Sequence, residues 1–188
     1  MAAPSKSKAV SKHDAIALLI ADHKSVKALF EQYKKLDGDD GADEKKSTIA
    51  ESICDQLTVH AQIEEDLFYP AARAAIDDNS LLDEAEVEHA TAKDLIEQLR
   101  GMTPSDPLFD AKVKVLGEYI DHHVNEEQDE LFPKVSQSDL DTAALGAELL
   151  ERKNQLMSEM GISAEPVSED IPPPQTRKGK AGTLRVRK

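Results

Sequence analysis

Four histidines and two glutamates in this chain have the residue types and the spacing that a metal centre requires. Each glutamate follows a histidine by four residues, so the two side chains of each pair share one face of an α-helix. Imidazole nitrogens and carboxylate oxygens together suit iron, zinc and other transition metals. We interpret the six residues as candidate metal ligands, although any one of the histidines alone is better explained as a satisfied core residue. The six are His23, His60, Glu64, His89, His123 and Glu127.

The candidates fall in an internal repeat of the sequence. The segment HKSVKALFEQY, which begins at His23, aligns without gaps with HATAKDLIEQL, which begins at His89. The segment HAQIEEDLFYP, which begins at His60, aligns in the same way with HVNEEQDELFP, which begins at His123. The chain is therefore interpreted as two copies of one helical hairpin, each with one His and one His-x-x-x-Glu.

The apolar residues around the candidates recur every three or four positions, which predicts four long helices. The first helix is expected to begin at a capping pattern formed by Ser11 and Asp14. It is expected to stop in the glycine-rich stretch 38–41. The second helix contains Pro70, which is expected to kink or terminate it.

The third and fourth helices carry their own end signals. Ser80 is the expected cap of the third helix, and Gly101 is its expected C-terminal stop. Ser105 or Asp106 is expected to cap the fourth helix, with Pro107 in its first turn.

A shorter fifth helix is predicted from the capping pair Ser138 and Asp141 to Gly161. No segment shows the alternation of a β-strand, so the predicted fold class is all-α: an antiparallel up-down-up-down four-helix bundle with an additional C-terminal helix. The predicted units are a flexible N-terminus (1–12), the four-helix bundle (13–135), the additional C-terminal helix (136–161) and a disordered basic tail (162–188).

All six candidates lie on the apolar stripe of their helix, and such stripes face the core. A lone ionised glutamate in a core costs several kcal/mol. No lysine or arginine occupies the stripes, so the glutamates need a positive partner of another kind. Two metal ions, each with two imidazole nitrogens and with shared carboxylate oxygens, supply that charge.

Other residues that carry chemistry have simpler interpretations. His122 has polar neighbours on its helix and is expected to be solvated. His13 lies about 15 Å along the helix from the first candidate histidine, which is too far for ligation. Lys93 lies one turn after the third candidate histidine, and we expect it to reach solvent rather than the centre. Cys54 is the single cysteine, which excludes an internal disulfide framework and favours a packing role.

The order of these motifs on four helices resembles the hemerythrin-like HHE cation-binding family, as do the flanking words ADHKSVKALFEQY, EEDLFYPAA and DELFPKV. The resemblance covers roughly residues 13–135. It implies two iron ions with an oxo or hydroxo bridge inside an antiparallel four-helix bundle. The residues that match the terminal nitrogen ligands are His23, His60, His89 and His123, and those that match the bridging carboxylates are Glu64 and Glu127.

The sequence departs from the oxygen-carrying hemerythrins at two positions. Those carriers resemble this chain but have a second histidine in the third helix, where Lys93 stands here. Their second carboxylate is an aspartate five residues after its histidine, whereas here Glu127 follows His123 by four. The missing histidine argues against simple reversible oxygen carriage and implies an open or water-filled position on at least one iron.

The charge of the chain limits its partners. The formal net charge is −14, and the acids are absent from residues 1–12 and 171–188, which are basic. The acidic middle excludes a nucleic-acid-binding core, because phosphate contacts need a basic face. The sequence shows no secretory signal and no membrane span, so we expect a soluble, cytoplasmic protein.

Together these patterns predict a di-iron protein that binds oxygen, nitric oxide or peroxide in sensing, storage or stress response. A binding protein is favoured over an enzyme. The alternatives are a di-iron enzyme that scavenges peroxide or nitric oxide or donates iron for repair, and an iron sensor or metallochaperone. The sequence does not decide the oligomeric state.

Overall fold

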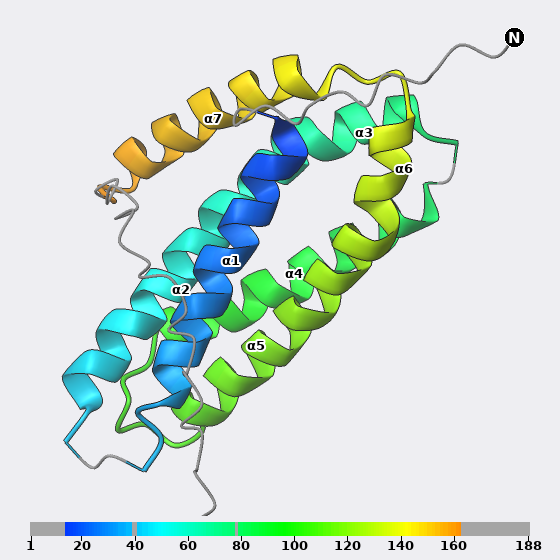
Figure 1. Cartoon of the computed structure of the whole chain (residues 1–188). Helices are drawn as coiled ribbons and strands as arrows, with labels where there is room; N and C mark the ends of the chain where they lie inside the picture. Colours follow the sequence, from blue (N-terminus) through cyan, green and yellow to red (C-terminus); the bar gives the residue numbers. More distant parts are fainter. Residues whose placement is uncertain (1–13, 39–40, 78, 163–188) are drawn as a thin grey trace, which may run out of the picture.

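The computed structural model of the chain describes residues 14–38, 41–77 and 79–162, and every regular element in these ranges is a helix (Figure 1). This confirms the all-α prediction. The predicted flexible N-terminus, His13 and the predicted tail from residue 163 onward lie outside the described residues. The elements are α1 (Ala15–Lys34), α2 (Asp43–Ile63), the π-helical turn η1 (Glu64–Phe68), α3 (Tyr69–Ala75), α4 (Ser80–Arg100), α5 (Phe109–Glu126), the π-helical turn η2 (Glu127–Leu131), α6 (Phe132–Gln137) and α7 (Thr142–Glu159).

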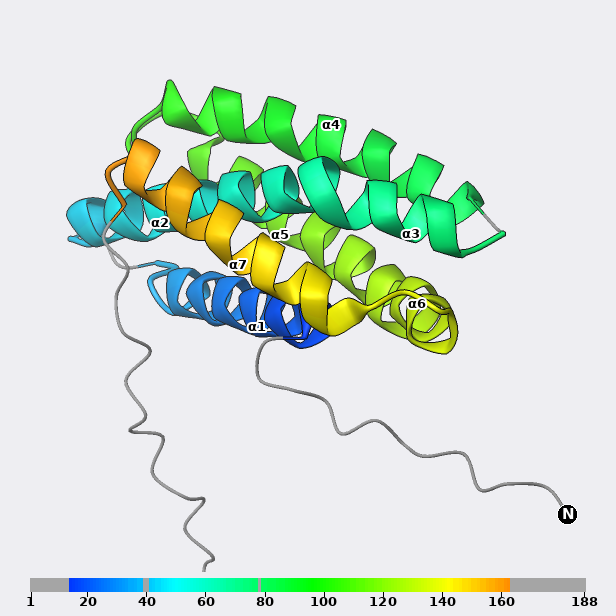
Figure 2. The ribbon, with the colours of Figure 1, turned by 90° about the horizontal axis from the view of Figure 1, so that it is seen from above.

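The helices form four long rods of alternating direction. One rod is α1, the next is α2 continued by η1 and α3, the third is α4, and the fourth is α5 continued by η2 and α6 (Figures 1 and 2). Contacts join α1 to α2 and α4 to α5, as expected for two hairpins, and further contacts join α2 to α4 and α1 to α5. The fifth long helix, α7, lies outside the four rods and packs against α1 and α2. None of the described helices has the length and hydropathy needed to cross a membrane.

The ends of the outer helices follow their capping residues. Asp14 caps α1 by accepting hydrogen bonds from the amides of Ile16 (3.0 Å) and Ala17 (3.4 Å), while Ser11 lies outside the described residues. Helix α7 is capped by Asp141, which accepts from the Ala144 amide at 3.1 Å. The predicted partner of Asp141 in that cap was Ser138; its hydroxyl instead donates to the Val135 carbonyl at 2.7 Å, so this half of the prediction was wrong.

The starts of α4 and α5 differ from the prediction. Ser80 is the first residue of α4 rather than its cap, which is Asn79. Asp106 does not cap α5, because its carboxylate accepts from the backbone amide (2.7 Å) and hydroxyl (2.8 Å) of Thr103 and closes a separate turn. Helix α5 therefore begins at Phe109, after Pro107, and its cap position has the left-handed φ of 73°. The predicted stop of α4 is confirmed, since its C-cap is Gly101.

Proline does not end the second rod, contrary to one predicted outcome. Pro70 and its repeat-equivalent Pro133 lie in the first turn of α3 and α6, each directly after a π-helical turn. A proline has no amide hydrogen and its ring crowds the preceding turn, and the wider π turn accommodates this within a continuous helix. The amides of Tyr69 and Phe132 bond instead to the carbonyls five residues back.

The six candidate ligands divide the core into two apolar halves. One half lies next to α3, α6 and α7 and includes Leu19, Phe68 and Leu131. The other lies toward the opposite ends and includes Val26 and Leu116. The bundle thus holds a polar layer between two dry packed layers, which fixes the positions of the side chains in that layer.

Candidate metal centre

The structure brings all six candidate ligands together in the middle of the bundle. Each of the four long rods contributes: α1 one histidine, α4 one histidine, and the two rods with π turns one histidine and one glutamate each. The histidines are 4–6% exposed and the glutamates 0–2% exposed, which is rare for ionisable side chains without a partner. The two glutamates are the first residues of η1 and η2.

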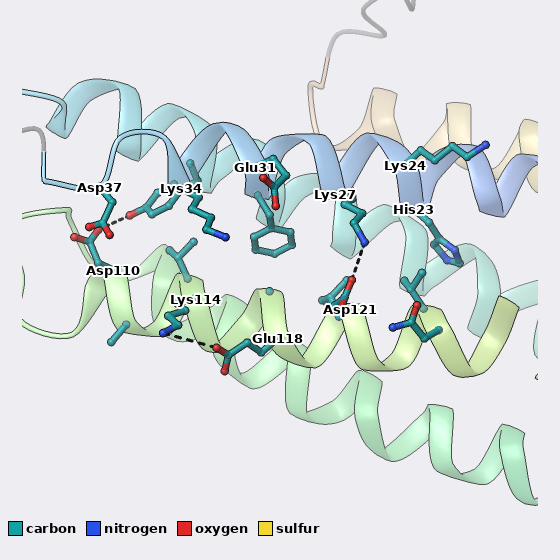
Figure 3. A pocket seen from close by; sticks show the side chains of 18 of the residues that line it. His23, Lys24, Lys27, Glu31, Lys34, Asp37, Asp110, Lys114, Glu118 and Asp121 are labelled. Atoms are coloured by element: carbon teal, nitrogen blue, oxygen red, sulfur yellow. Dashed lines mark hydrogen bonds and ion pairs between the residues drawn. The ribbon is translucent and has the colours of Figure 1, made fainter. Parts of the chain in front are cut away.

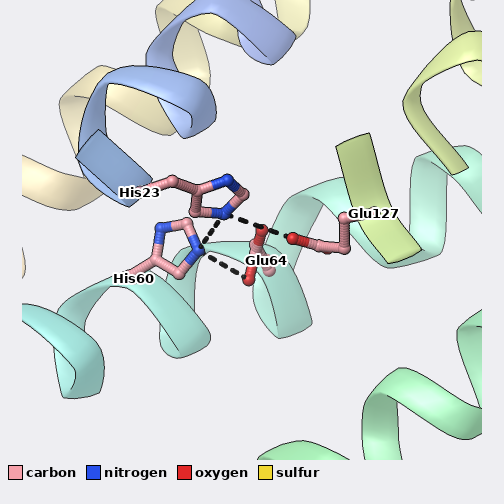
Figure 4. Close-up of side chains that lie close together, drawn as sticks. All are labelled: His23, His60, Glu64 and Glu127. Atoms are coloured by element: carbon pink, nitrogen blue, oxygen red, sulfur yellow. Dashed lines mark hydrogen bonds and ion pairs between the residues drawn. The ribbon is translucent and has the colours of Figure 1, made fainter. Parts of the chain in front are cut away.

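Two histidines from the first hairpin define one side of the centre. His23 Nε2 and His60 Nε2 lie 3.0 Å apart. His60 Nε2 lies 3.2 Å from Glu64 Oε2, and His23 Nε2 lies 3.2 Å from Glu127 Oε2 (Figure 4). These four ligand atoms converge on one point from three of the four rods.

Two histidines from the second hairpin define the other side. His89 Nε2 and His123 Nε2 lie 3.1 Å apart. The same carboxylates reach them, with Glu64 Oε2 at 3.5 Å from His89 Nε2 and Glu127 Oε2 at 3.6 Å from His123 Nε2. Each carboxylate therefore lies between the two histidine pairs, in the position of a bridge.

These distances fit metal coordination. Two atoms bound to one ion at about 2.1 Å lie roughly 3.0 Å apart at right angles and roughly 3.4 Å apart at the tetrahedral angle. The contacts among the six side chains run from 3.0 to 3.6 Å. The arrangement accommodates two ions, one against each histidine pair, with Glu64 and Glu127 shared between them.

An acidic residue directly before the first histidine of each hairpin lies near Nδ1 of the second histidine of that hairpin. Glu88 Oε2 accepts from His123 Nδ1 at 2.7 Å. At the repeat-equivalent place, Asp22 Oδ2 lies 3.6 Å from His60 Nδ1. Sequence reasoning missed both carboxylates, although the signal was present, because both precede the aligned histidines of the repeat.

The residue directly after each bridging glutamate supports a histidine of the other hairpin. Glu65 Oε1 accepts from His89 Nδ1 at 3.0 Å, and the Gln128 side-chain amide lies 3.1 Å from His23 Nδ1. Glu65 also accepts from Lys93 Nζ at 2.7 Å. The hydrogen bond from His89, together with Lys93, lowers the pKa of the Glu65 carboxyl to about 2. Thus each hairpin orients the ligands of its partner, and sequence reasoning missed this pair as well.

These outer hydrogen bonds fix which nitrogen faces the centre in the second histidine pair. Ionised carboxylates only accept, so the Nδ1 atoms of His89 and His123 carry the protons that bond to Glu65 and Glu88. The Nε2 atoms of the two rings then face each other 3.1 Å apart, and in the neutral form of each ring Nε2 carries the lone pair. Two facing lone pairs repel, and a cation placed against both removes the repulsion. This is the electronic state that metal-bound histidine requires.

The carboxylate oxygens in the centre are also short of partners. Both oxygens of Glu64 and Oε2 of Glu127 are buried without a hydrogen bond among the described residues. Burial raises the pKa of the Glu64 carboxyl well above its ordinary value, and the nearby Glu127 carboxylate raises it further. Buried oxygens without donors are costly, and metal ions satisfy them. The donor set therefore fits a dinuclear metal site.

Tyr69 reaches the centre although the helical pattern does not place it there. Its hydroxyl donates to Glu127 Oε1 at 3.0 Å and lies 3.2 Å from His89 Nε2. The π turn explains this, since the residue that lies over Glu64 is five positions on rather than four. The repeat-equivalent residue is Phe132, whose ring stacks on His23 at a centroid distance of 5.9 Å. At this pair of equivalent positions the two halves of the centre thus differ in one hydroxyl group.

Two hollows adjoin the ligands. A cavity of about 20 Å³ lies among the four histidines and is closed by apolar side chains that include Leu57, Ile96 and Ile120. A groove of about 780 Å³ runs along the outside between α1 and α5 and reaches His23 (Figure 3). Paired charges line the groove, such as Lys27 with Asp121 at 2.9 Å. The inner cavity has room for one molecule of about the size of water.

Lys93 and His122 lie as the sequence predicted. The Lys93 side chain is 43% exposed, and its ammonium group pairs with Glu65 rather than with the centre. The His122 side chain is 63% exposed and lies outside the buried ligand set. Cys54 is buried in one of the two apolar halves and has a packing role.

The geometry defines a four-helix bundle with a buried His/Glu centre for metal cations. Residues 14–135 match the Hemerythrin HHE cation binding domain family, which is more than half of the chain. The chain belongs to this family, as the resemblance in its motifs predicted.

Two further similarities come from individual proteins. A DNA nickase of Nostoc sp. (strain PCC 7120) is 28% identical over 148 residues, which cover 76% of this chain and 40% of the nickase. The chain thus spans less than half of the length of that relative. A crystal structure of an HHE cation binding domain-containing protein, the Rv2633c homolog from Mycobacterium kansasii, superposes with a TM-score of 0.65 at 22% identity, covering 78% of this chain and 88% of that one. The similarity of the two structures supports the fold.

Proposed function

We propose that the chain binds two iron ions, with an oxo or hydroxo bridge, at the six buried side chains and that this centre interacts with oxygen, nitric oxide or peroxide. The observation that carries the proposal is the pair of buried imidazole Nε2 atoms, 3.1 Å apart, with the Glu64 and Glu127 carboxylates beside them. Mixed nitrogen and oxygen ligands with bridging carboxylates in a helical bundle suit a redox-active pair such as iron.

In this proposal the ligands divide by hairpin. His23 and His60 would hold one ion and His89 and His123 the other, with Glu64 and Glu127 shared, since each carboxylate lies near both histidine pairs. The pair supplies two-electron redox chemistry when it is bound. The protein contributes the rest: Glu65 and Glu88 hold protons at the Nδ1 atoms of His89 and His123, which orients these two rings and raises their basicity as ligands.

The small size of the inner cavity supports a diatomic or peroxide ligand. Its volume of about 20 Å³ favours a small ligand over an organic substrate, and its apolar wall limits the entry of water. The centre offers six protein ligands to two ions, so positions remain open on at least one of them. Tyr69 holds a proton at its hydroxyl within 3.0 Å of Glu127 and is placed to donate a hydrogen bond to a ligand in the centre.

A role in sensing, storage or stress response follows from such a ligand, and we favour a binding protein over an enzyme. The second candidates are peroxide or nitric oxide scavenging and iron donation or sensing. The acidic composition of residues 13–170 supports a core that binds neither membrane nor nucleic acid, and we propose a cytoplasmic location.

The experiment is anaerobic loading with ferrous iron followed by optical spectra on addition of oxygen, nitric oxide or peroxide. A stable, reversible spectrum supports the binding protein. Turnover of peroxide or nitric oxide supports the scavenging enzyme. A protein that takes up no iron, or a single zinc ion, contradicts the di-iron centre.

A further inference from the structure

We propose that Glu88, His122 and Glu126 form a separate, solvent-facing site for one divalent transition-metal ion, such as Zn²⁺ or Fe²⁺. The site lies on α4 and α5, outside the buried ligand set. The proposal stands on its own geometry and does not depend on the identity of the metal in the buried centre.

The three side chains present one ligand atom each to a common point. His122 and Glu126 are one turn apart on α5, and His122 Nε2 lies 3.2 Å from Glu126 Oε1. Glu88 comes from the neighbouring helix α4, and its Oε1 lies 3.7 Å from His122 Nε2. Ligand atoms around one ion with bonds of about 2.1 Å lie roughly 3.0 to 3.4 Å apart, so small side-chain shifts complete the site.

Glu88 is held in place before any ion binds. Its other oxygen, Oε2, accepts the hydrogen bond from His123 Nδ1 at 2.7 Å, and the side chain is only 15% exposed. Glu126 is 29% exposed and stands on a rigid helix. An i,i+4 pair of His and Glu is common on helix surfaces. That pattern does not explain the third ligand, Glu88, which comes from a second helix and is held by the buried His123.

The charge of the cluster favours a cation. Two carboxylates and a neutral imidazole carry a net charge of −2. Among the described residues, the ion pairs of Glu88 and Glu126 are with His122 and His123 and not with lysine or arginine. His122 is 63% exposed, which leaves the remaining coordination positions open to water. One nitrogen and two oxygens with water in the other positions suit zinc, ferrous iron and related divalent ions.

Glu88 connects this surface site to the buried centre. One of its oxygens faces the surface site, while the other holds the proton of His123. An ion bound at the surface withdraws charge from the Glu88 carboxylate and weakens the hydrogen bond that it accepts from His123 Nδ1. We therefore expect an ion at the surface site to affect His123, a ligand of the buried centre, through the Glu88 carboxylate.

The test is a calorimetric titration of the full-length protein with Zn²⁺, compared with the His122→Ala variant. The wild-type protein is expected to bind one more equivalent than the variant, both after iron loading and without iron. Because His122 is exposed, the variant should fold and retain the same iron content. Glu126→Gln should weaken the same equivalent at least tenfold. The matched control Glu118→Gln, about two turns earlier on α5, should bind like the wild type.

The two proposals fail in different ways. Equal numbers of Zn²⁺ equivalents in the wild type and in His122→Ala overturn the surface site, whatever the buried centre contains. Failure to load iron overturns the di-iron centre, while a difference of one Zn²⁺ equivalent between the two proteins still supports the surface site. A Glu118→Gln variant that loses the equivalent would show general charge attraction and would also overturn the site.

Discussion

Replacing Glu64 by glutamine should stabilise the metal-free protein while it destroys the ability of metal to stabilise it. The side chain is 0% exposed, and neither of its oxygens has a hydrogen-bond partner among the described residues. Burial and the Glu127 carboxylate raise its pKa well above the model-compound value of 4.5. In the metal-free fold the raised pKa favours the neutral form of the carboxyl. Glutamine reproduces the shape of that neutral form without needing a proton.

The sign and size of the effect follow from linkage. Because the folded-state pKa lies above the unfolded-state one, the contribution of the carboxyl to stability is present in full below the unfolded-state pKa. It is lost as the pH rises through the folded-state pKa. At a pH between the two values, holding the proton on Glu64 costs about 1.4 kcal/mol for each pH unit above the unfolded-state pKa. Each kcal/mol of that cost that glutamine removes should raise the melting temperature of the metal-free protein by roughly 2 to 4 °C.

With metal bound, the wild type should be more stable than Glu64→Gln. Metal that binds only the folded state at 1,000 times its dissociation constant stabilises the wild type by about 4 kcal/mol, and Glu64→Gln loses most of this gain. Thermal unfolding with and without metal measures both effects, and the matched control is Glu51→Gln, an exposed carboxylate on α2. A variant that is less stable than the wild type in the metal-free state would refute the account of Glu64 as an uncompensated ligand.

Three further outcomes are expected. Asp22→Ala should weaken metal affinity about ten- to a hundredfold in a chelator competition, since Asp22 faces the Nδ1 atom of His60; unchanged affinity would contradict this role. Burial lowers the pKa of His60 to about 4, so the metal-free protein should lose stability as the pH falls from about 6.5 to about 4. Denaturant titrations should show that His60→Gln removes this part of the slope, and an identical slope would argue against it. Tyr69→Phe leaves Glu127 without its donor and should cost about 1 to 3 kcal/mol in the metal-free protein, whereas the exposed Tyr119→Phe should cost little.

The bundle and the gathering of the six side chains follow from features that a sequence displays directly. Periodic apolar residues give the helices, and the repeat gives their pairing into two hairpins. His60 and Glu64 share a helical face because they are four residues apart, and their neighbours on that face are apolar. Pattern and burial agree here, so local spacing is enough to predict which side chains meet.

The residues that support the ligand histidines could be recognised only from the three-dimensional packing. Glu88 and Glu65 look like solvated acids on a polar face, and only the contact between hairpins shows that each supports a histidine on another helix. The contact of Tyr69 with the centre could not be predicted, because a helical period of 3.6 residues places Phe68 and not Tyr69 one turn after Glu64. The π turn shifts this position by one residue. The helix starts also depend on competition among short-range hydrogen bonds, as when Asp106 closes a turn with Thr103 rather than capping α5.

The central claim is that six buried side chains of this chain hold two iron ions. The most direct measurement is the iron content of the protein after anaerobic loading and removal of excess metal, together with its Mössbauer spectrum. We expect two irons per chain in a coupled pair. This iron content should be lost in Glu64→Gln and retained in His122→Ala. One iron or one zinc per chain, or a full pair of irons in Glu64→Gln, would contradict it.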